Sequence, residues 1–274
     1  MLSSTNKKII KKWYYKIGFP TEFDQEFEEK LESDVCLDTC PLSEYDTKCD
    51  DGIKNLFSYL LYCEALEESY AEKGIPEDIL LDTLKDIAVW TKTWSDLKGR
   101  LYLGELEWLK RHLEMRLFKL GRLQFCMAES ENAIPSKRLA EGDNVIEVHI
   151  PEGEPLSAEA CTRSLQRARE FFEFFFPEFS YSLFTCHSWL LDTSLDGYLK
   201  QGSNILSFAK LFTIVRQDPS DAMFGYLFRW GAKREDVESI APRSSLAAKV
   251  KSALTQNPVF FEGLGYIEKQ QSKP

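Results

Sequence analysis

The spacing of apolar residues changes near Lys119, and this change constrains the fold more than any other feature of the chain. Before it, apolar side chains recur at helical spacing, as in Phe23, Phe27 and Leu31, which would lie on one face of a helix. After it, short apolar runs alternate with polar loops, a pattern typical of mixed strands and helices. The 274 residues are enough for two domains. We therefore predict an α+β protein with a helical N-terminal domain over residues 1–118 and a mixed α/β domain over residues 119–274.

Individual elements follow from the same periodicities and from their boundary residues. The helices predicted in the first domain span residues 5–17, 53–72, 76–97 and 103–117, with one more beginning at Glu22. The strands predicted in the second domain span residues 121–127, 145–150, 181–188, 211–216 and 259–267. Its helices are predicted over residues 158–176 and, as shorter segments, near residues 203–209 and 246–254, and residues 222–230 are predicted as a helix or an irregular segment. The first two strands are expected to pair as a hairpin with a long connection.

Acidic residues are concentrated in the N-terminal part of the chain. Between Glu22 and Asp82 there are nineteen acidic residues and four basic ones, and the whole chain carries a net charge of −10. Nucleic-acid binding needs lysine and arginine to neutralise phosphates, so we expect no DNA or RNA partner. The acidic residues either attract a cationic amine or a basic partner, or they only solvate the outer faces of helices.

The cysteines and the apolar runs indicate where the protein works. Seven cysteines, an odd number in a chain with no export signal, favour reduced thiols and a cytoplasmic protein. No apolar run approaches the roughly 18 residues of a membrane span, so we expect no membrane association. Cys36, Cys40 and Cys49 lie in a polar loop and would need Cys63 as a fourth zinc ligand. Because no CxxC pair is present, we predict no metal site.

The segment from Val145 to Pro177 is predicted to form a strand, a loop over residues 151–157 and an amphipathic helix. The first backbone N–H groups of such a helix lack intrahelical partners, and the helix dipole adds partial positive charge there, so a phosphate fits the site. The alternative is that the helix start binds only its capping side chain, which would be Ser157.

Four phrases of the sequence resemble one protein family. They are GRLQF at 121–125, VHIPEGEPLS at 148–157, CHSWLLD at 186–192 and GSNIL at 202–206. Together with the predicted order of strands and helices, they resemble a bacterial acyltransferase family with a helical N-terminal domain of the N-acyltransferase type and a GNAT-like C-terminal domain. The resemblance covers nearly the whole chain. It implies a GNAT-like fold and an acyl-CoA-dependent N-acyltransferase, with acetyl-CoA or a longer acyl-CoA as co-substrate and an unidentified acceptor, either a small-molecule amine or another group.

The resemblance also implies where the coenzyme would bind. In the wider superfamily the turn after this strand holds the coenzyme A pyrophosphate on bare backbone amides, which here places Gly153 and Ser157 in the site. This chain departs from that pattern, because two prolines remove amide donors and Glu152 and Glu154 add negative charge. Arg163, and Arg167 one turn later, would supply compensating positive charge, or they are solvated surface residues.

Candidate catalytic residues come from the same comparison, because GNAT enzymes commonly place a base on the strand over residues 145–150. Glu147 and His149 share one face of that strand and are the first candidates for the general base. His187, at the end of the next strand, is the second, and Tyr198 is the candidate acid for the thiolate leaving group. Cys186 and His187 cannot form a nucleophile–base pair in a regular strand, because adjacent side chains face opposite sides.

Two functions remain open at the level of sequence. The first is an acyl-CoA-dependent N-acyltransferase acting on an unidentified amine. The alternative is a catalytically inactive GNAT-fold module that has lost the coenzyme site and serves in ligand binding or protein interaction. The departure in the loop over residues 151–157 is the feature that separates them.

Overall fold

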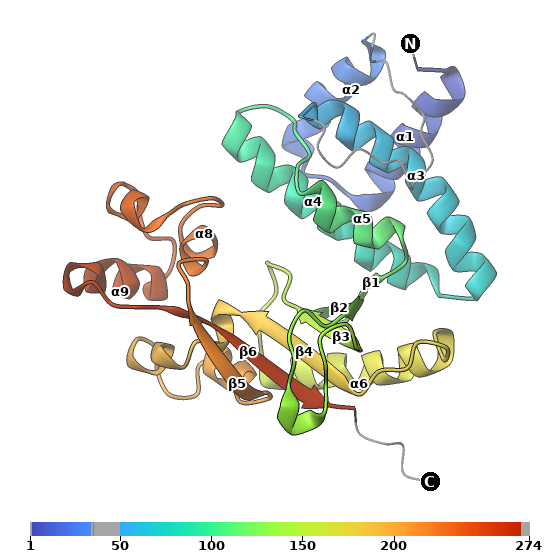
Figure 1. Cartoon of the computed structure of the whole chain (residues 1–274). Helices are drawn as coiled ribbons and strands as arrows, with labels where there is room; N and C mark the ends of the chain where they lie inside the picture. The colour runs from blue at the N-terminus through green and yellow to red at the C-terminus, as the bar shows by residue number, and fades with distance from the viewer. Residues whose placement is uncertain (1, 34, 36–49, 270–274) are drawn as a thin grey trace. The chain divides into compact units, whose positions relative to one another are not determined.

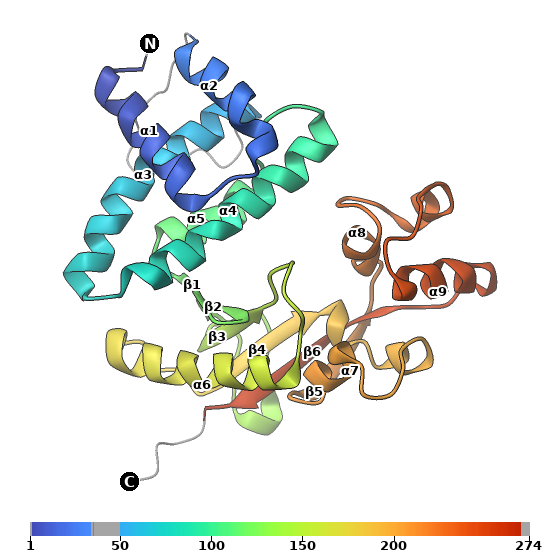
Figure 2. The ribbon, with the colours of Figure 1, turned by 180° about the vertical axis from the view of Figure 1, so that it is seen from behind.

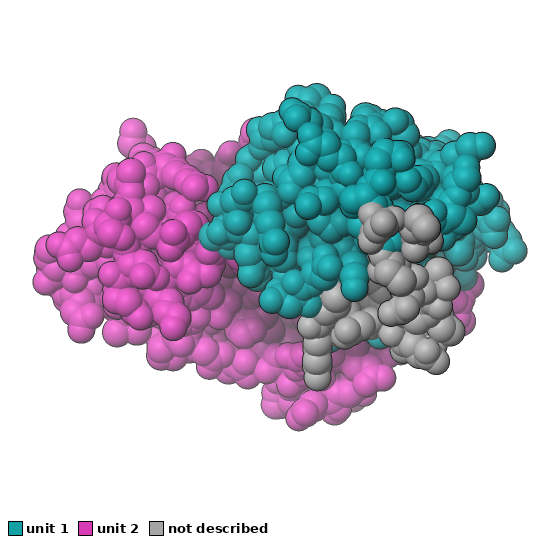
Figure 3. Space-filling view, turned by 90° about the horizontal axis from the view of Figure 1, so that it is seen from above, with its two compact units in different colours: residues 1–120 teal, residues 121–274 magenta. Residues whose placement is uncertain are grey.

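A computed structural model describes residues 2–33, 35 and 50–269 of the chain. It divides into two compact units, residues 1–120 and residues 121–274 (Figure 3). The predicted fold class is confirmed, since unit 1 is built mainly of helices and unit 2 of a mixed sheet with helices (Figure 1). Cys36, Cys40 and Cys49 lie outside the described residues. Among the residues described, no helix is long and apolar enough to cross a membrane.

Unit 1 contains five α-helices and one strand in its described residues. They are α1 (Ser4–Ile17), α2 (Asp24–Glu32), α3 (Gly52–Lys73), α4 (Glu77–Lys98), α5 (Leu106–Leu113) and β1 (Leu117–Leu120), with a 3₁₀ turn η1 (Thr21–Phe23) before α2. Side chains of Ser3 and Asp51 cap the starts of α1 and α3, and left-handed glycines end α1, α3 and α4. The helices predicted over residues 5–17, 53–72 and 76–97 are confirmed as α1, α3 and α4.

Stacked aromatic rings form the core where the first helices of unit 1 meet. Trp13, Tyr14, Phe27 and Phe57 are fully or almost fully buried. The ring of Tyr14 lies parallel to that of Phe27, with centroids 3.6 Å apart, and Phe57 meets Phe27 edge-on. These residues supply large apolar surfaces from one face of each helix, as the helical spacing predicted.

One boundary prediction in unit 1 was wrong. The helix expected over residues 103–117 is only α5, because Glu105 and Met115 both have positive φ angles, of 56° and 53°, which a helix interior does not accept. The chain after Met115 becomes β1, in which Leu117, Phe118 and Leu120 are buried.

Unit 2 contains the strands β2 to β6 and the longest helix of that unit, α6. Its elements are β2 (Leu123–Glu129), β3 (Asn144–His149), α6 (Ala158–Phe175), β4 (Leu183–Ser188), α7 (Asn204–Ala209), β5 (Thr213–Pro219), α8 (Met223–Leu227), α9 (Ser245–Ala253) and β6 (Phe261–Glu268), with short 3₁₀ turns η3 (Pro135–Lys137), η4 (Trp189–Leu191), η5 (Thr193–Gly197), η6 (Arg234–Ser239) and η7 (Leu254–Gln256). Within unit 2 the described strands run in the order β2-β3-β4-β6-β5. The last strand in sequence thus lies inside the sheet, and β5 forms an edge.

Pairing is antiparallel between β2 and β3, β4 and β6, and β6 and β5, whereas β3 and β4 are parallel. The hairpin expected between the first two strands of this unit is confirmed as β2 and β3. The pairing of β5 with β6 shifts register between Ile214 and Arg216.

Helix α6 covers one face of the sheet, as Figures 1 and 2 show from opposite sides. Its buried side chains recur at helical spacing: Cys161, Ser164, Leu165, Ala168, Phe171 and Phe172. Ser164 accepts a hydrogen bond from the Leu123 backbone N–H at 3.0 Å and so ties the helix to β2. The polar strand residues described below lie on the opposite face of the sheet from α6.

Candidate functional site

The parallel pairing of β3 and β4 is short. It joins Ile146 to Phe184 and Glu147 to Thr185, while β3 continues to His149 and β4 to Ser188. Neighbouring strands normally satisfy each other's backbone groups along their length. The ends of β3 and β4 therefore lie beyond their mutual ladder, at the carboxyl ends of the parallel strands, where ligands usually bind in an α/β sheet.

Glu147 and His149 are the two polar residues that the strand periodicity predicted to share a face, and the structure brings them into contact. His149 Nε2 lies 3.3 Å from Glu147 Oε2. The two side chains are about a quarter to a third exposed, at 25% for Glu147 and 30% for His149. A carboxylate at this distance orients the imidazole ring. The structure thus places a carboxylate and an imidazole in contact at the end of β3.

The face that carries this pair extends to β2 and β4. In β2, Gln124 lies opposite His149 and Cys126 lies opposite Glu147, and both β2 residues are buried. In β4, Thr185 lies beside Glu147. Paired residues of neighbouring strands project from the same side of a sheet, so these side chains surround the Glu147–His149 pair.

Gln124 is a site residue that the sequence did not reveal. It is 2% exposed, and its Nε2 has no hydrogen-bond partner among the described residues. Its strand was predicted, but its place opposite His149 depends on the register of a hairpin with a long connection, which strand periodicity alone does not fix.

The side chain of Arg122 binds the loop over residues 151–157 through two backbone carbonyls. The guanidinium donates from Nη1 to the carbonyl of Pro151 at 2.9 Å and from Nε to the carbonyl of Pro155 at 3.2 Å. Arg122 is 7% exposed, and burial lowers the pKa of its guanidinium. A buried positive charge thus lies under the loop whose Glu152 and Glu154 are negative.

Gly153 inside this loop and Ser157 at its end set the local backbone conformation. Gly153 has φ = 109°, which a residue with a side chain rarely adopts. Ser157 caps α6, because its Oγ accepts a hydrogen bond from the Ala160 N–H at 3.2 Å. The helix start therefore has one of its amides occupied by its own cap, as the alternative to phosphate binding required.

The two arginines predicted to assist the coenzyme lie further along α6. Arg163 is exposed and pairs with Glu159 one turn earlier on the same helix. Arg167 is partly buried. Arg163 thus has the contact expected of a solvated helix surface, whereas the buried cation near the loop is Arg122.

The second candidate base, His187, projects from the same face as Thr185 because it lies two residues further along β4. It is 43% exposed, and its Nε2 lies 3.9 Å from Asp218 Oδ2. Its neighbour Cys186 is buried, and burial, with a smaller contribution from the Glu147 carboxylate, raises the pKa of that thiol. The expectation that Cys186 and His187 face opposite sides is confirmed.

Tyr198, the candidate acid, lies at the end of η5. Its ring packs on Phe260, with centroids 5.6 Å apart, beside the small core formed by α8, α9 and their loops. Its backbone carbonyl accepts a hydrogen bond from Lys249 Nζ at 2.7 Å. The ring is partly buried, and its packing is that of a core residue.

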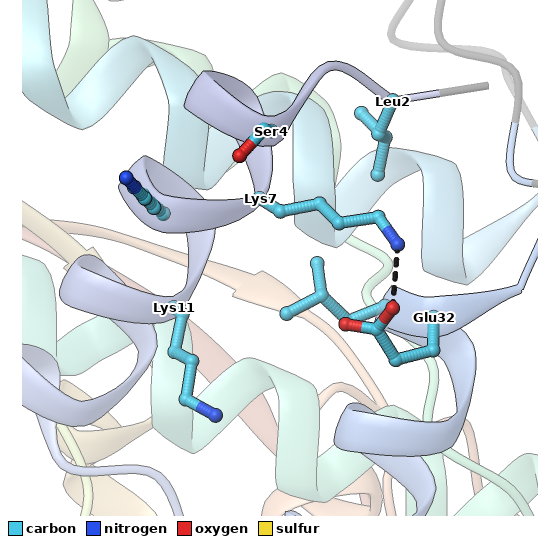
Figure 4. A pocket seen from close by; sticks show the side chains of 7 residues that line it. Leu2, Ser4, Lys7, Lys11 and Glu32 are labelled. Carbon is cyan, nitrogen blue, oxygen red and sulfur yellow. Dashed lines mark hydrogen bonds and ion pairs between the residues drawn. The ribbon is translucent and has the colours of Figure 1, made fainter.

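A hollow of about 510 Å³ is present in unit 1, between α1 and α2. Figure 4 shows its lining, in which Lys7 pairs with Glu32 at 2.8 Å and Lys11 lies nearby. None of the predicted site residues lines this hollow. Across the part of the chain that the structure describes, no three His, Cys, Asp or Glu side chains gather as a metal site would require.

Two family domains match this chain. Residues 117–267 match the GNAT-like C-terminal domain, and residues 12–115 match the N-acyltransferase N-terminal domain. No curated protein sequence matches it.

Solved structures of acyltransferases are similar to it. One, in complex with decanoyl-CoA and teicoplanin, is 27% identical with a TM-score of 0.69, over 78% of this chain and 66% of that chain. A mutant acyltransferase in complex with octanoyl-CoA gives the same identity of 27%, TM-score of 0.69 and coverages of 78% and 66%. A third, in complex with decanoyl-CoA, is 24% identical with a TM-score of 0.70, over 95% of this chain and 76% of that chain, and shows the shared fold. The first two matches span slightly less than two thirds of those proteins.

Proposed function

Because this chain belongs to the family of the GNAT-like C-terminal domain, we propose that it is an acyl-CoA-dependent N-acyltransferase. The observation that carries this proposal is the Glu147–His149 contact of 3.3 Å at the end of β3, next to the point where β3 and β4 cease to pair. This arrangement offers a proton acceptor for the amine, which acyl transfer from a thioester to an amine needs.

In the proposed reaction the nitrogen of an amine attacks the thioester carbonyl, the C–N bond forms and the C–S bond breaks. The amine loses one proton to the protein, and the leaving thiolate takes up one proton. When His149 carries its proton on Nε2, it donates to Glu147, and its lone pair is on Nδ1. The carboxylate then stabilises the imidazolium that forms when the amine is deprotonated, so the two residues act as one base.

Coenzyme binding is supported by the solved relatives, which hold decanoyl-CoA or octanoyl-CoA, and by the buried Arg122. The guanidinium holds the carbonyls of Pro151 and Pro155 and so fixes the loop around Gly153. Its charge offsets the two loop glutamates, which otherwise oppose a phosphate. The amide groups of a pantetheine arm would find partners on the backbone of β3 beyond Glu147, where β4 no longer pairs.

The alternative function is a module with this fold and no coenzyme site. It is favoured by one observation, the occupation of the α6 start by its own cap Ser157. The two functions differ in whether acyl-CoA binds the folded protein. Binding of decanoyl-CoA or acetyl-CoA must raise the melting temperature, because a ligand of the folded state stabilises it.

The catalytic test measures release of the coenzyme thiol with an amine acceptor. We expect Glu147→Gln to lower kcat by about a hundredfold with little change in the KM for acyl-CoA, since general-base assistance is typically of that size. Glu141→Gln, which removes the same charge from an exposed loop of unit 2, is the matched control. Equal turnover in both variants would remove Glu147 from the mechanism, whereas absence of any acyl-CoA binding would favour the module.

A further inference from the structure

Gln124 has an environment that its own strand does not explain. Its side chain is 2% exposed, and Nε2 has no hydrogen-bond partner among the described residues. Buried amide groups in folded proteins nearly always have a partner, because leaving a donor unsatisfied is destabilising. A retained donor of this kind is expected where a ligand supplies the missing acceptor.

The position of Gln124 relative to the proposed base is fixed by the register of the sheet. Gln124 lies directly opposite His149 in the antiparallel pair of β2 and β3. Directly opposed residues have Cβ atoms about 4.5–5.5 Å apart and point to the same side of the sheet. A ligand whose amine meets the Glu147–His149 pair therefore presents its neighbouring atoms to Gln124.

The charge around Gln124 restricts the group that it binds. The amide N–H of a glutamine donates to oxygen. Cys126 lies two residues after Gln124 on the same face of β2, and Glu147 lies opposite Cys126 on β3. The Glu147 carboxylate would therefore repel a negatively charged ligand group placed next to Gln124. A neutral oxygen, as in a hydroxyl or an amide carbonyl, fits the site better than a carboxylate.

We propose that Gln124 donates a hydrogen bond to a neutral oxygen of the acceptor substrate, held within about two carbon atoms of the amine that is acylated. This inference rests on the proposed function and narrows the acceptor to amino alcohols, amino sugars and similar neutral hydroxyl- or carbonyl-bearing amines. Gln124 is then a specificity residue of the acceptor site, whereas Arg122 and the loop over residues 151–157 serve the coenzyme.

The test compares two acceptors of equal length, 2-aminoethanol and propylamine, with kcat/KM expressed per free amine. The wild type should prefer 2-aminoethanol, and Gln124→Met should reduce that preference by about tenfold, which is the size expected for one hydrogen bond. Gln166→Met makes the same substitution on the exposed side of α6 and should leave the preference unchanged.

The melting temperature gives a second readout. If Gln124 only supported the fold, its replacement would lower the melting temperature, whereas the inference predicts a rise. Replacing an unsatisfied buried donor by an apolar side chain of similar shape removes the penalty, so Gln124→Met should melt a few degrees above the wild type. Gln166→Met should melt close to the wild type. A lower melting temperature for Gln124→Met with an unchanged acceptor preference would show that Gln124 only supports the fold, and would overturn the inference.

Failure of the proposed function is distinguishable from failure of this inference. If the wild type transfers no acyl group, binding of 2-aminoethanol is followed instead by saturation-transfer NMR. Binding by the wild type that is lost in Gln124→Met would support the acceptor site without catalysis. Absence of binding in both proteins would overturn it.

Discussion

Gly263→Ala tests how closely the η4 turn is packed on the sheet. Gly263 lies in β6 between Ser188 of β4 and Gln217 of β5. A Cβ added there would lie 2.6 Å from the Leu191 carbonyl oxygen and 2.4 Å from Gln217 Nε2, so the backbone of η4 has to move by several tenths of an ångström. The same displacement breaks the 3.0 Å hydrogen bond that Gln217 Nε2 donates to that carbonyl.

The expected loss of stability combines these two effects. Overpacking a filled site typically costs about 1–3 kcal/mol, and losing a neutral hydrogen bond about 0.5–1.5 kcal/mol, so we expect about 2–4 kcal/mol in total. For a domain of this size that corresponds to a fall in melting temperature of about 5–15 °C. Calorimetry or circular dichroism measures the melting temperature directly.

Gly197→Ala is the matched control, because an added Cβ there meets nothing within 4 Å and the glycine lies in the same unit. It should change the free energy of unfolding by no more than about 0.5 kcal/mol. If Gly263→Ala melts at the temperature of Gly197→Ala, the close approach of η4 to the sheet does not exist in solution, and the reasoning is refuted.

Two further predictions concern ionisable groups. Burial raises the thiol pKa of Cys63 and Cys186. At neutral pH both thiols should therefore react with iodoacetamide only after the protein is unfolded, which mass spectrometry of the labelled peptides measures. Rapid labelling of either cysteine in the native protein would contradict this. Hydrogen bonds from Lys12 and, to a smaller extent, from Trp13 lower the pKa of Glu64 below its ordinary 4.5. The contribution of Glu64 to stability is therefore complete above pH 4.5 and lost as the pH falls through the lowered pKa. In urea titrations, the difference in unfolding free energy between the wild type and Glu64→Gln should shrink between about pH 6 and pH 3. A difference that stays constant over this range would contradict the prediction.

Sequence periodicity predicted the fold well where local signals and packing agree. The helices of unit 1 have cap residues at their ends, and α6 has one apolar stripe bounded by Ser157 and Pro177. β1 was missed because no glycine or proline lies between the end of α5 and its four residues. The chain turns at Met115, which has a positive φ angle, and methionine is not a residue type associated with positive φ.

The candidate site was only partly predictable. That Glu147 and His149 share one face follows from the alternation of side chains along one strand, and it was expected; their contact of 3.3 Å was not. Gln124 and Arg122 depend on pairing across a long connection and on a loop that folds over β2, and local spacing contains no information about either. Roles for His149, His187, Tyr198 and the residues of the coenzyme loop stay predictions, and the role of Glu147 is tested by the Glu147→Gln assay above.

The register shift in β5 has a consequence for the behaviour of the protein at high concentration. An edge strand with a regular row of free N–H and C=O groups is a template on which strands of other molecules add. Here Ile214 and Arg216 are out of step, and Arg216 pairs with Asp218 at 2.6 Å, both of them exposed by nearly half. An incoming strand would meet an interrupted ladder and a pair of charges, so the edge of this sheet resists aggregation by strand addition.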